Sequence, residues 1–178
     1  MAIEYIPLPP PQNPEGMATY LNNELLRLSQ AISAISTTAR GSLYLAATSA
    51  TQVIGTTPAL LTVFDTEIDP ASIDVNITTD SITALFRGAY SSTVDMTVST
   101  GSNNVTMNFS IYINGAPLAS GAASVFAKTS GEPVSLSLTA AGQVPRGGKL
   151  EVFASVASGS ETLTFTRLRW GVSGTAID

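Results

Sequence analysis

Three acidic residues alternate along one short stretch of the sequence, namely Asp65, Glu67 and Asp69. In an extended segment, alternate side chains project to the same side, so these carboxylates together could offer oxygen ligands to a calcium ion. However, Pro70 follows directly, and the sequence contains no further loop with the Gly and Asp spacing of a calcium site. The pattern therefore favours a solvated acidic turn, and we predict that the protein holds no metal ion and no other cofactor.

A second group of residues that could do chemistry lies near the C-terminus, where Arg167, Arg169 and Trp170 are close in sequence. Two guanidinium groups and an indole ring could stack against a sugar or grip an acidic surface. The same residues also fit an amphipathic last strand in which Trp170 packs at the boundary of the core or of a subunit. This second arrangement is the more common one, and the sequence leaves both open.

The residue types that most enzymes need are missing. The sequence contains no histidine and no cysteine. This removes the usual general base, the usual zinc ligands, the Ser-His and Cys-His nucleophile pairs, and disulfides. Paired carboxylates could still hydrolyse a glycoside, but no pair is singled out by its spacing. We therefore predict that the protein is not an enzyme.

Length and charge restrict the organisation and the partners further. A chain of 178 residues can form one domain with a real core plus an extension. The net charge of −5 and the scattered Lys and Arg residues argue against nucleic acid as a partner. The N-terminus has Glu4 and several prolines where a secretion signal would be basic and apolar, and no stretch approaches membrane-spanning length. We therefore expect assembly in a cytoplasm and no membrane partner.

The element around which the chain is organised is a helix near the N-terminus. Asn13 can accept hydrogen bonds from the first free backbone amides, and Pro14 suits the first helical position because it has no N–H. Isoleucine at both core positions of the later heptad favours three or more strands over two. We predict that residues 13–40 form a short trimeric neck, although a helix lying across the chain's own sheet would also fit. The neck seam consists of Leu21, Leu25, Leu28, Ile32 and Ile35.

Residues 1–12 form a separate segment rich in proline. Proline fixes its own backbone and keeps the preceding residue out of the helical region, so this segment is predicted to be an extended arm. It also carries Ile3, Tyr5, Ile6 and Leu8, which a tail in solvent would hardly need. We predict that the arm anchors the chain in a groove on another protein, the alternative being a disordered tail.

Residues 41–178 have the pattern of strands separated by turn residues, with Gly41 at the joint after the helix. The clearest strand is Val105–Ile113, and Asn114-Gly115 after it is the strongest short hairpin signal. Near Thr166-Arg167 the apolar residues change face, which indicates a β-bulge. Roughly nine or ten strands of this kind predict a mainly β chain that forms an antiparallel β-sandwich of the jelly-roll type.

Five segments of this body carry a recognisable order of motifs: 82–90 with Gly88-Ala89-Tyr90, 109–115 ending in Asn-Gly, the Leu-rich 136–144, 149–152, and the final 163–172. This order resembles that of the tumour-necrosis-factor-like and complement-globular-head jelly roll. The resemblance covers about residues 43–174. It implies a jelly-roll head that forms trimers, and it implies little about a ligand.

The N-terminal part resembles a different group of proteins. Pro9-Pro10-Pro11, followed by the run from Tyr20 to Leu28, is similar to the N-terminus of small virion proteins of tailed bacteriophages. This resemblance implies a particle-bound anchor, a short trimeric neck and a jelly-roll head. We therefore expect a structural virion protein, a homotrimeric capsid decoration or head fibre that is made in the host cytoplasm and anchored to another virion protein. The alternatives are a tail-fibre connector and a receptor- or glycan-binding tip.

Overall fold

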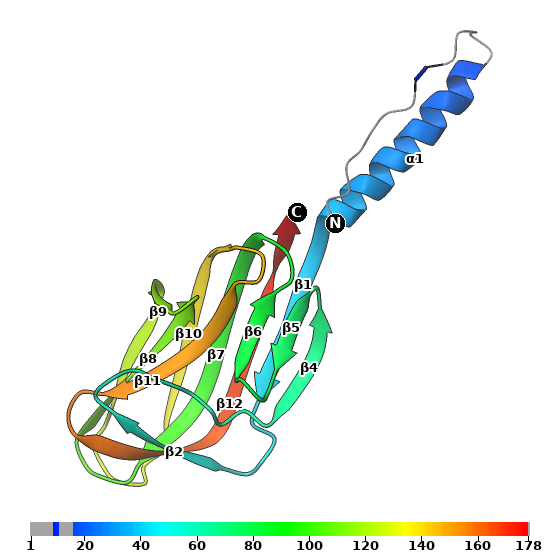
Figure 1. The fold of residues 1–178 in the computed structure, drawn as a ribbon. Helices are drawn as coiled ribbons and strands as arrows, with labels where there is room; N and C mark the ends of the chain where they lie inside the picture. The colour runs from blue at the N-terminus through cyan, green and yellow to red at the C-terminus, as the bar shows by residue number, and fades with distance from the viewer. Residues whose placement is uncertain (1–8, 11–15, 178) are drawn as a thin grey trace.

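The computed structural model describes residues 9–10 and 16–177, without the side chains of 29–37, 69 and 176–177. Figure 1 shows a helix that projects from one end of a two-layered β body. Within the described residues, no helix combines the length and the apolar character that crossing a bilayer would require. In chain order, the elements are α1 (Met17–Ile35), β1 (Ser36–Tyr44), β2 (Ala50–Gly55), β3 (Ala59–Leu60), β4 (Thr66–Ala71), β5 (Ile73–Asn76), β6 (Ser81–Ala84), β7 (Gly88–Thr100), β8 (Val105–Ile113), β9 (Ala116–Ala127), β10 (Val134–Val144), β11 (Lys149–Val156) and β12 (Ser160–Ile177).

The strands form two antiparallel sheets that pack face to face. Sheet A has the order β10-β7-β12-β1-β4, with β2 paired to β12. Sheet B has the order β5-β6-β11-β8-β9, with β3 paired to β11. Some neighbours are consecutive hairpins, such as β5-β6 and β8-β9, whereas others are distant in sequence, since β12 lies between β1 and β7. The predicted mainly β, antiparallel sandwich is confirmed.

The core lies between the sheets and is built by strict alternation along the strands. In β8, Met107, Phe109 and Ile111 are fully buried, as the alternation in the sequence predicts. The ring of Phe109 meets that of Phe165 from the opposite sheet at 6.5 Å in an edge-to-face arrangement. Such contacts tie the two layers together.

Two local sequence features produce the backbone irregularities predicted from them, a hairpin turn and a β-bulge. Asn114 and Gly115 have φ values of 51° and 77°, so the two-residue turn joins β8 to β9 with Ile113 opposite Ala116. Asparagine and glycine tolerate this left-handed region best, which is why the hairpin forms here. The pairing of β12 with β7 shifts between Phe165 and Arg167, which confirms the predicted bulge.

The joint between helix and body differs from the prediction. Asn13 and Pro14 lie outside the described residues, and α1 ends at Ile35 rather than at residue 40. Strand β1 begins at Ser36 without a loop, because β12 is long enough to pair with it from Ser36 opposite Ile177 onward. Gly41 is therefore no joint. It is buried inside β1, where an added Cβ would lie 2.7 Å from the side chains of Ile73 and Val75.

The acidic stretch also differs from the prediction of a turn. Glu67 and Asp69 lie in β4, an edge strand of sheet A that pairs with β1 on one side, and Asp65 directly precedes this strand. An edge strand accepts Pro70, because a missing N–H costs nothing on the unpaired side. The carboxylate of Asp65 accepts hydrogen bonds from the backbone N–H groups of Ala46 (2.7 Å) and Ala47 (2.9 Å), which hold its pKa below the usual value. Asp65 therefore stabilises the backbone of the segment that directly follows β1.

Candidate functional site

The helix α1 presents apolar side chains to solvent. In Figure 1 it lies beyond the end of the sandwich and covers neither sheet. The seam residues Leu21, Leu25 and Leu28 are 52%, 62% and 38% exposed. Ile32 and Ile35 continue the helix, but their side chains lie outside the described ones. The alternative of a helix lying across the chain's own sheet is therefore wrong.

Side chains of α1 outside the seam show what else could stabilise the helix. Leu26 is also 62% exposed, although it lies outside the heptad seam. Glu24 and Arg27, three residues apart, form an ion pair at 2.6 Å. Such a pair adds about 0.2–0.5 kcal/mol to a helix, whereas each leucine that becomes buried contributes about 1.5–3 kcal/mol. The exposed leucines of α1 therefore suit association with another protein surface.

The outward face of sheet A is a second candidate, and it is largely polar. We call this surface the sheet A face. Cross-strand hydroxyl pairs link its strands, with Thr93 and Thr139 at 3.2 Å and Thr97 and Ser135 at 3.0 Å. Its outward residues are mostly small or hydroxylic: Ser42, Ala89, Ser91, Thr93, Thr97, Ser135, Ser137, Thr139, Ala141, Gly171, Ser173 and Thr175.

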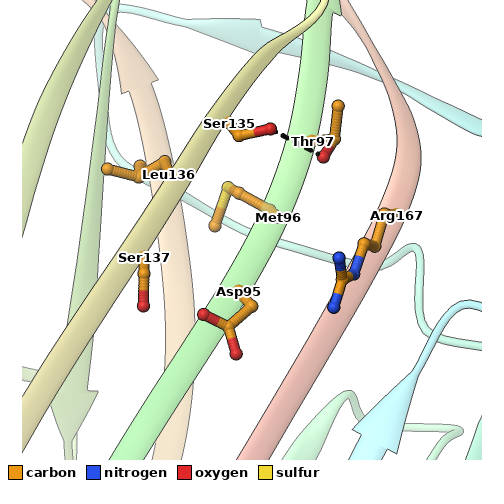
Figure 2. A pocket seen from close by; sticks show the side chains of 7 residues that line it. All are labelled: Asp95, Met96, Thr97, Ser135, Leu136, Ser137 and Arg167. Carbon is orange, nitrogen blue, oxygen red and sulfur yellow. Dashed lines mark hydrogen bonds between the residues drawn. The ribbon is translucent and has the colours of Figure 1, made fainter.

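A hollow of about 340 Å³ lies in the sheet A face over β10, β7 and β12. Figure 2 shows the carboxylate of Asp95 and the guanidinium of Arg167 on neighbouring strands above it, with the hydroxyl group of Ser137 on β10. Arg169 on β12 lies opposite Asp95 on β7 in the register of the two strands, and its side chain is exposed. The hollow therefore offers one charged donor, Arg167, and one charged acceptor, Asp95, beside hydroxyl groups.

The predicted cluster of Arg167, Arg169 and Trp170 is divided between two faces. Trp170 is fully buried, its Nε1–H donates to the hydroxyl oxygen of Ser92 at 2.8 Å, and its ring packs 5.7 Å from that of Phe64. The two arginines are exposed on the sheet A face. Adjacent residues of a strand point to opposite faces, so the indole cannot join the arginines on one ligand. The amphipathic last strand is the correct interpretation.

One aromatic feature escaped the sequence reasoning. On the outward face of sheet B, the rings of Tyr112 and Phe153 stack with centroids 4.2 Å apart, and Phe126 is 54% exposed. Alternation in β8 does place Tyr112 on the outer face. Its partner could not be found without the register of β8 against β11, which sets Tyr112 beside Glu151 and Phe153 beside Ser110.

The predicted anchoring residues, Ile3, Tyr5, Ile6 and Leu8, lie outside the described part of the chain. Pro9 and Pro10 are described, and both are exposed. The arm therefore stays a prediction from sequence.

Solved structures that resemble this chain include a tumour necrosis factor and a complement protein. The Eiger tumour necrosis factor (TNF) of S. frugiperda matches with a TM-score of 0.52 and 14% identity, over 80% of this chain and 95% of that chain. The globular domain of the zebrafish complement 1qA protein matches with a TM-score of 0.46 and 18% identity, over 79% and 97%. No protein-family model and no curated protein matches the sequence. The likeness to the TNF structure supports the predicted jelly-roll fold and nothing finer.

Proposed function

We propose that this chain is a structural virion protein of a tailed bacteriophage, a homotrimeric capsid decoration or head fibre. The observation that carries the proposal is the exposed seam of α1, with Leu21, Leu25 and Leu28 between 38% and 62% exposed on a helix that covers no sheet. A helix of this length is marginal in water by itself, so its leucines need a partner. The chain's own second and third copies provide one without any further component.

The number of copies follows from the side chains of the seam. The isoleucines at residues 32 and 35 occupy both core positions of the heptad, which favours more than two strands. A parallel bundle of three helices would place three heads at one end and three N-terminal arms at the other. Three arms on one particle bind together, so modest individual contacts give a durable attachment.

The phage assignment itself is supported by the sequence of the N-terminus. The prolines at 9–11 and the run from Tyr20 to Leu28 resemble small virion proteins, and the apolar residues of 2–12 need a groove to bury them. The groove belongs to another virion protein in this proposal. The missing histidine and cysteine agree with a role that requires no catalysis.

The neck is tested with two matched variants. Leu25 and Leu26 are adjacent and equally exposed at 62%, but Leu25 lies in the seam and Leu26 outside it. We expect Leu25→Ser to weaken self-association at least about tenfold for each copy in the trimer, which corresponds to the loss of one buried leucine per copy, and Leu26→Ser to leave it unchanged. Light scattering of the full chain over a dilution series measures both. A wild-type chain with a monomeric mass at micromolar concentration contradicts the proposal.

The anchor is tested on particles. Deleting residues 2–12 should abolish incorporation into virions while leaving the thermal unfolding of the head nearly unchanged. Electron microscopy of particles made with the deleted chain counts the attached copies. Normal copy number without the arm would place the anchor in the helix or the head.

One observation favours the alternative of a receptor- or glycan-binding tip. The stacked pair Tyr112 and Phe153 and the exposed Phe126 lie on the outward face of sheet B, beside the polar side chains of Asn108 and Ser124. Aromatic rings next to hydrogen-bonding groups suit the apolar and polar faces of a sugar. Binding of labelled host surface polysaccharide to the full chain, lost in Tyr112→Ala, would support this alternative. Equal binding by both chains would exclude this face.

A further inference from the structure

The turn between β8 and β9 contains an asparagine that can react with its own backbone. Asn114 and Gly115 are the one Asn-Gly pair of the sequence, and both are exposed. Because glycine has no side chain, its backbone nitrogen can approach the side-chain amide carbon of the asparagine before it. Every other asparagine of the sequence precedes a residue whose side chain crowds this approach. The turn is therefore where this reaction has the lowest steric barrier.

The reaction is a deamidation that needs only the chain and water. The backbone nitrogen of Gly115 attacks Cγ of Asn114, a bond forms between these two atoms, and the bond from Cγ to Nδ2 breaks. The leaving nitrogen takes the proton of the Gly115 N–H and departs as ammonia. Water then opens the resulting cyclic imide at either carbonyl, which gives aspartate or isoaspartate at residue 114. Water has access, because a Cβ built on Gly115 would have no atom of the described structure within 4 Å.

The native backbone of the turn prevents the ring from closing. Asn114 has a φ of 51°, which places it in the left-handed region. In this region ψ is about +47°, so the nitrogen of Gly115 lies on the opposite side of the Cα–C bond from Cβ of Asn114. Ring closure requires the reacting atoms to be close and aligned, and this backbone holds them apart.

Two hydrogen bonds to the strand β11 hold Asn114 in this state. Its backbone N–H donates to the carbonyl oxygen of Lys149 at 2.9 Å, and its Oδ1 accepts from the backbone N–H of Lys149 at 2.8 Å. The second bond fixes the side-chain amide on the backbone of β11. Asn114 must therefore leave Lys149 and change its backbone conformation before it can react.

We propose that Asn114 is a modification site that the native hairpin keeps unreactive, with the backbone of Lys149 as the restraint. Deamidation then occurs in chains whose β8–β9 turn opens locally, without unfolding of the whole head. The loss of ammonia is irreversible, so each product records one such opening. The inference depends neither on the proposed trimer nor on the particle, and its tests leave both unaffected.

The two products differ in their effect on the hairpin. Aspartate keeps the backbone of the turn and an oxygen that the N–H of Lys149 can bind. Isoaspartate carries the main chain through the former side chain, which adds a methylene group to a turn that sets Ile113 opposite Ala116. We expect chains with isoaspartate to unfold at a lower temperature than Asn114→Asp chains. Equal thermal midpoints would overturn the effect assigned to this product.

The restraint is tested at the N–H that the side chain of Asn114 binds. Lys149→Pro removes this donor at the first residue of β11, where a strand accepts proline, whereas Lys149→Ala keeps it. We expect deamidation at residue 114 to be about tenfold faster in Lys149→Pro than in Lys149→Ala or the wild-type chain, the factor that one hydrogen bond of ordinary strength accounts for. Mass spectrometry of the peptide measures the conversion, and enzymatic methylation detects isoaspartate. Equal rates in a folded Lys149→Pro chain overturn the inference.

The wild-type chain provides a second test that needs no variant. Complete unfolding in urea releases the turn, so deamidation should be at least about tenfold faster there than in the native protein. Below the unfolding transition, its rate should rise with urea in parallel with hydrogen exchange of the Lys149 amide, because both require the same local opening. A native rate equal to the unfolded rate, or a rate that does not follow the exchange of this amide, overturns the inference.

Discussion

The head buries its largest apolar side chains, whereas the helix α1 exposes its leucines to solvent. In the head, Trp170, Phe109 and Phe165 are all less than 2% exposed, whereas on α1 Leu25 and Leu26 are each 62% exposed. The same hydrophobic driving force acts on both regions. The head satisfies it within one chain, and α1 can satisfy it only by meeting another surface. The stability of the head is therefore a property of the chain, while that of α1 depends on a surface that covers its leucines.

The largest effect is expected inside the head. Phe109→Ala removes a ring that is fully buried and that packs against Phe165 across the two sheets. We expect the free energy of unfolding to fall by about 3–5 kcal/mol. Urea unfolding followed by the fluorescence of Trp170, the one tryptophan of the sequence, reports this change. As a control, Phe126→Ala should cost much less, because that ring is 54% exposed.

A smaller effect separates two glycines of the same strand. An added Cβ at Gly174 would run into the carbonyl oxygen of Ala89 and lie 2.9 Å from the Cα of Tyr90, whereas Gly171 has open space. We expect Gly174→Ala to destabilise the head by about 2 kcal/mol, because the neighbouring backbone of β7 must move. Gly171→Ala should leave the urea midpoint of the head almost unchanged. Equal midpoints for the two variants would show that β12 is looser than its pairing indicates.

One buried carboxylate in the head lacks a hydrogen-bond partner for one of its oxygens, and replacing it should raise the free energy of unfolding. Asp80 is buried, its Oδ1 has no hydrogen-bond partner, and burial raises its pKa despite a hydrogen bond from the backbone N–H of Phe64. Asp80→Asn removes the buried charge and keeps an oxygen for Phe64, and asparagine tolerates the φ of 47°. We expect a gain of about 1 kcal/mol at pH 7.

The pH dependence of that gain identifies its cause. A carboxyl group with a raised pKa binds its proton more tightly in the folded state, so the native protein loses stability as the pH rises through the folded pKa. The advantage of Asp80→Asn should therefore be present at pH 7 and disappear as the pH falls below the ordinary value of 3.8. Thermal unfolding at a series of pH values measures this. A gain that persists at pH 3 would have another origin.

The smallest effect on the head should come from the helix. Leu25→Ser changes a side chain that contacts neither sheet, so the free energy of unfolding reported by Trp170 should change by less than about 0.5 kcal/mol. In contrast, the helical circular dichroism should become weaker on dilution sooner than in the wild-type chain. A large loss of head stability in this variant would mean that α1 and the head form one cooperative unit.

Local patterns in the sequence were sufficient for much of the fold. The alternation along Val105–Ile113, the Asn114-Gly115 turn and the change of face near Arg167 each depend on a few adjacent residues, and the structure contains all three. The seam of α1 was visible for the same reason, since heptad spacing is a local property.

The errors share one physical cause, which is pairing between segments far apart in sequence. The acidic stretch became β4 because β1 was available beside it, and the helix gave way to strand at Ser36 because β12 extended the pairing that far. Register likewise decided that Phe153 meets Tyr112. The burial of Trp170 depended on which face of β12 met sheet B. None of these contacts has a signal in the residues of one segment alone.

The uninterrupted passage from α1 into β1 also has a mechanical consequence. A pull on the N-terminus is transmitted along the axis of β1, whose hydrogen bonds to β12 run from Ser36 to Tyr44. Antiparallel hydrogen bonds lie perpendicular to the strand, so this force loads the whole ladder in shear and cannot open it one rung at a time. A head tethered through α1 therefore resists tension with nine residue pairs at once. Because no loop separates α1 from β1, bending or twisting of the helix is transmitted directly to the head.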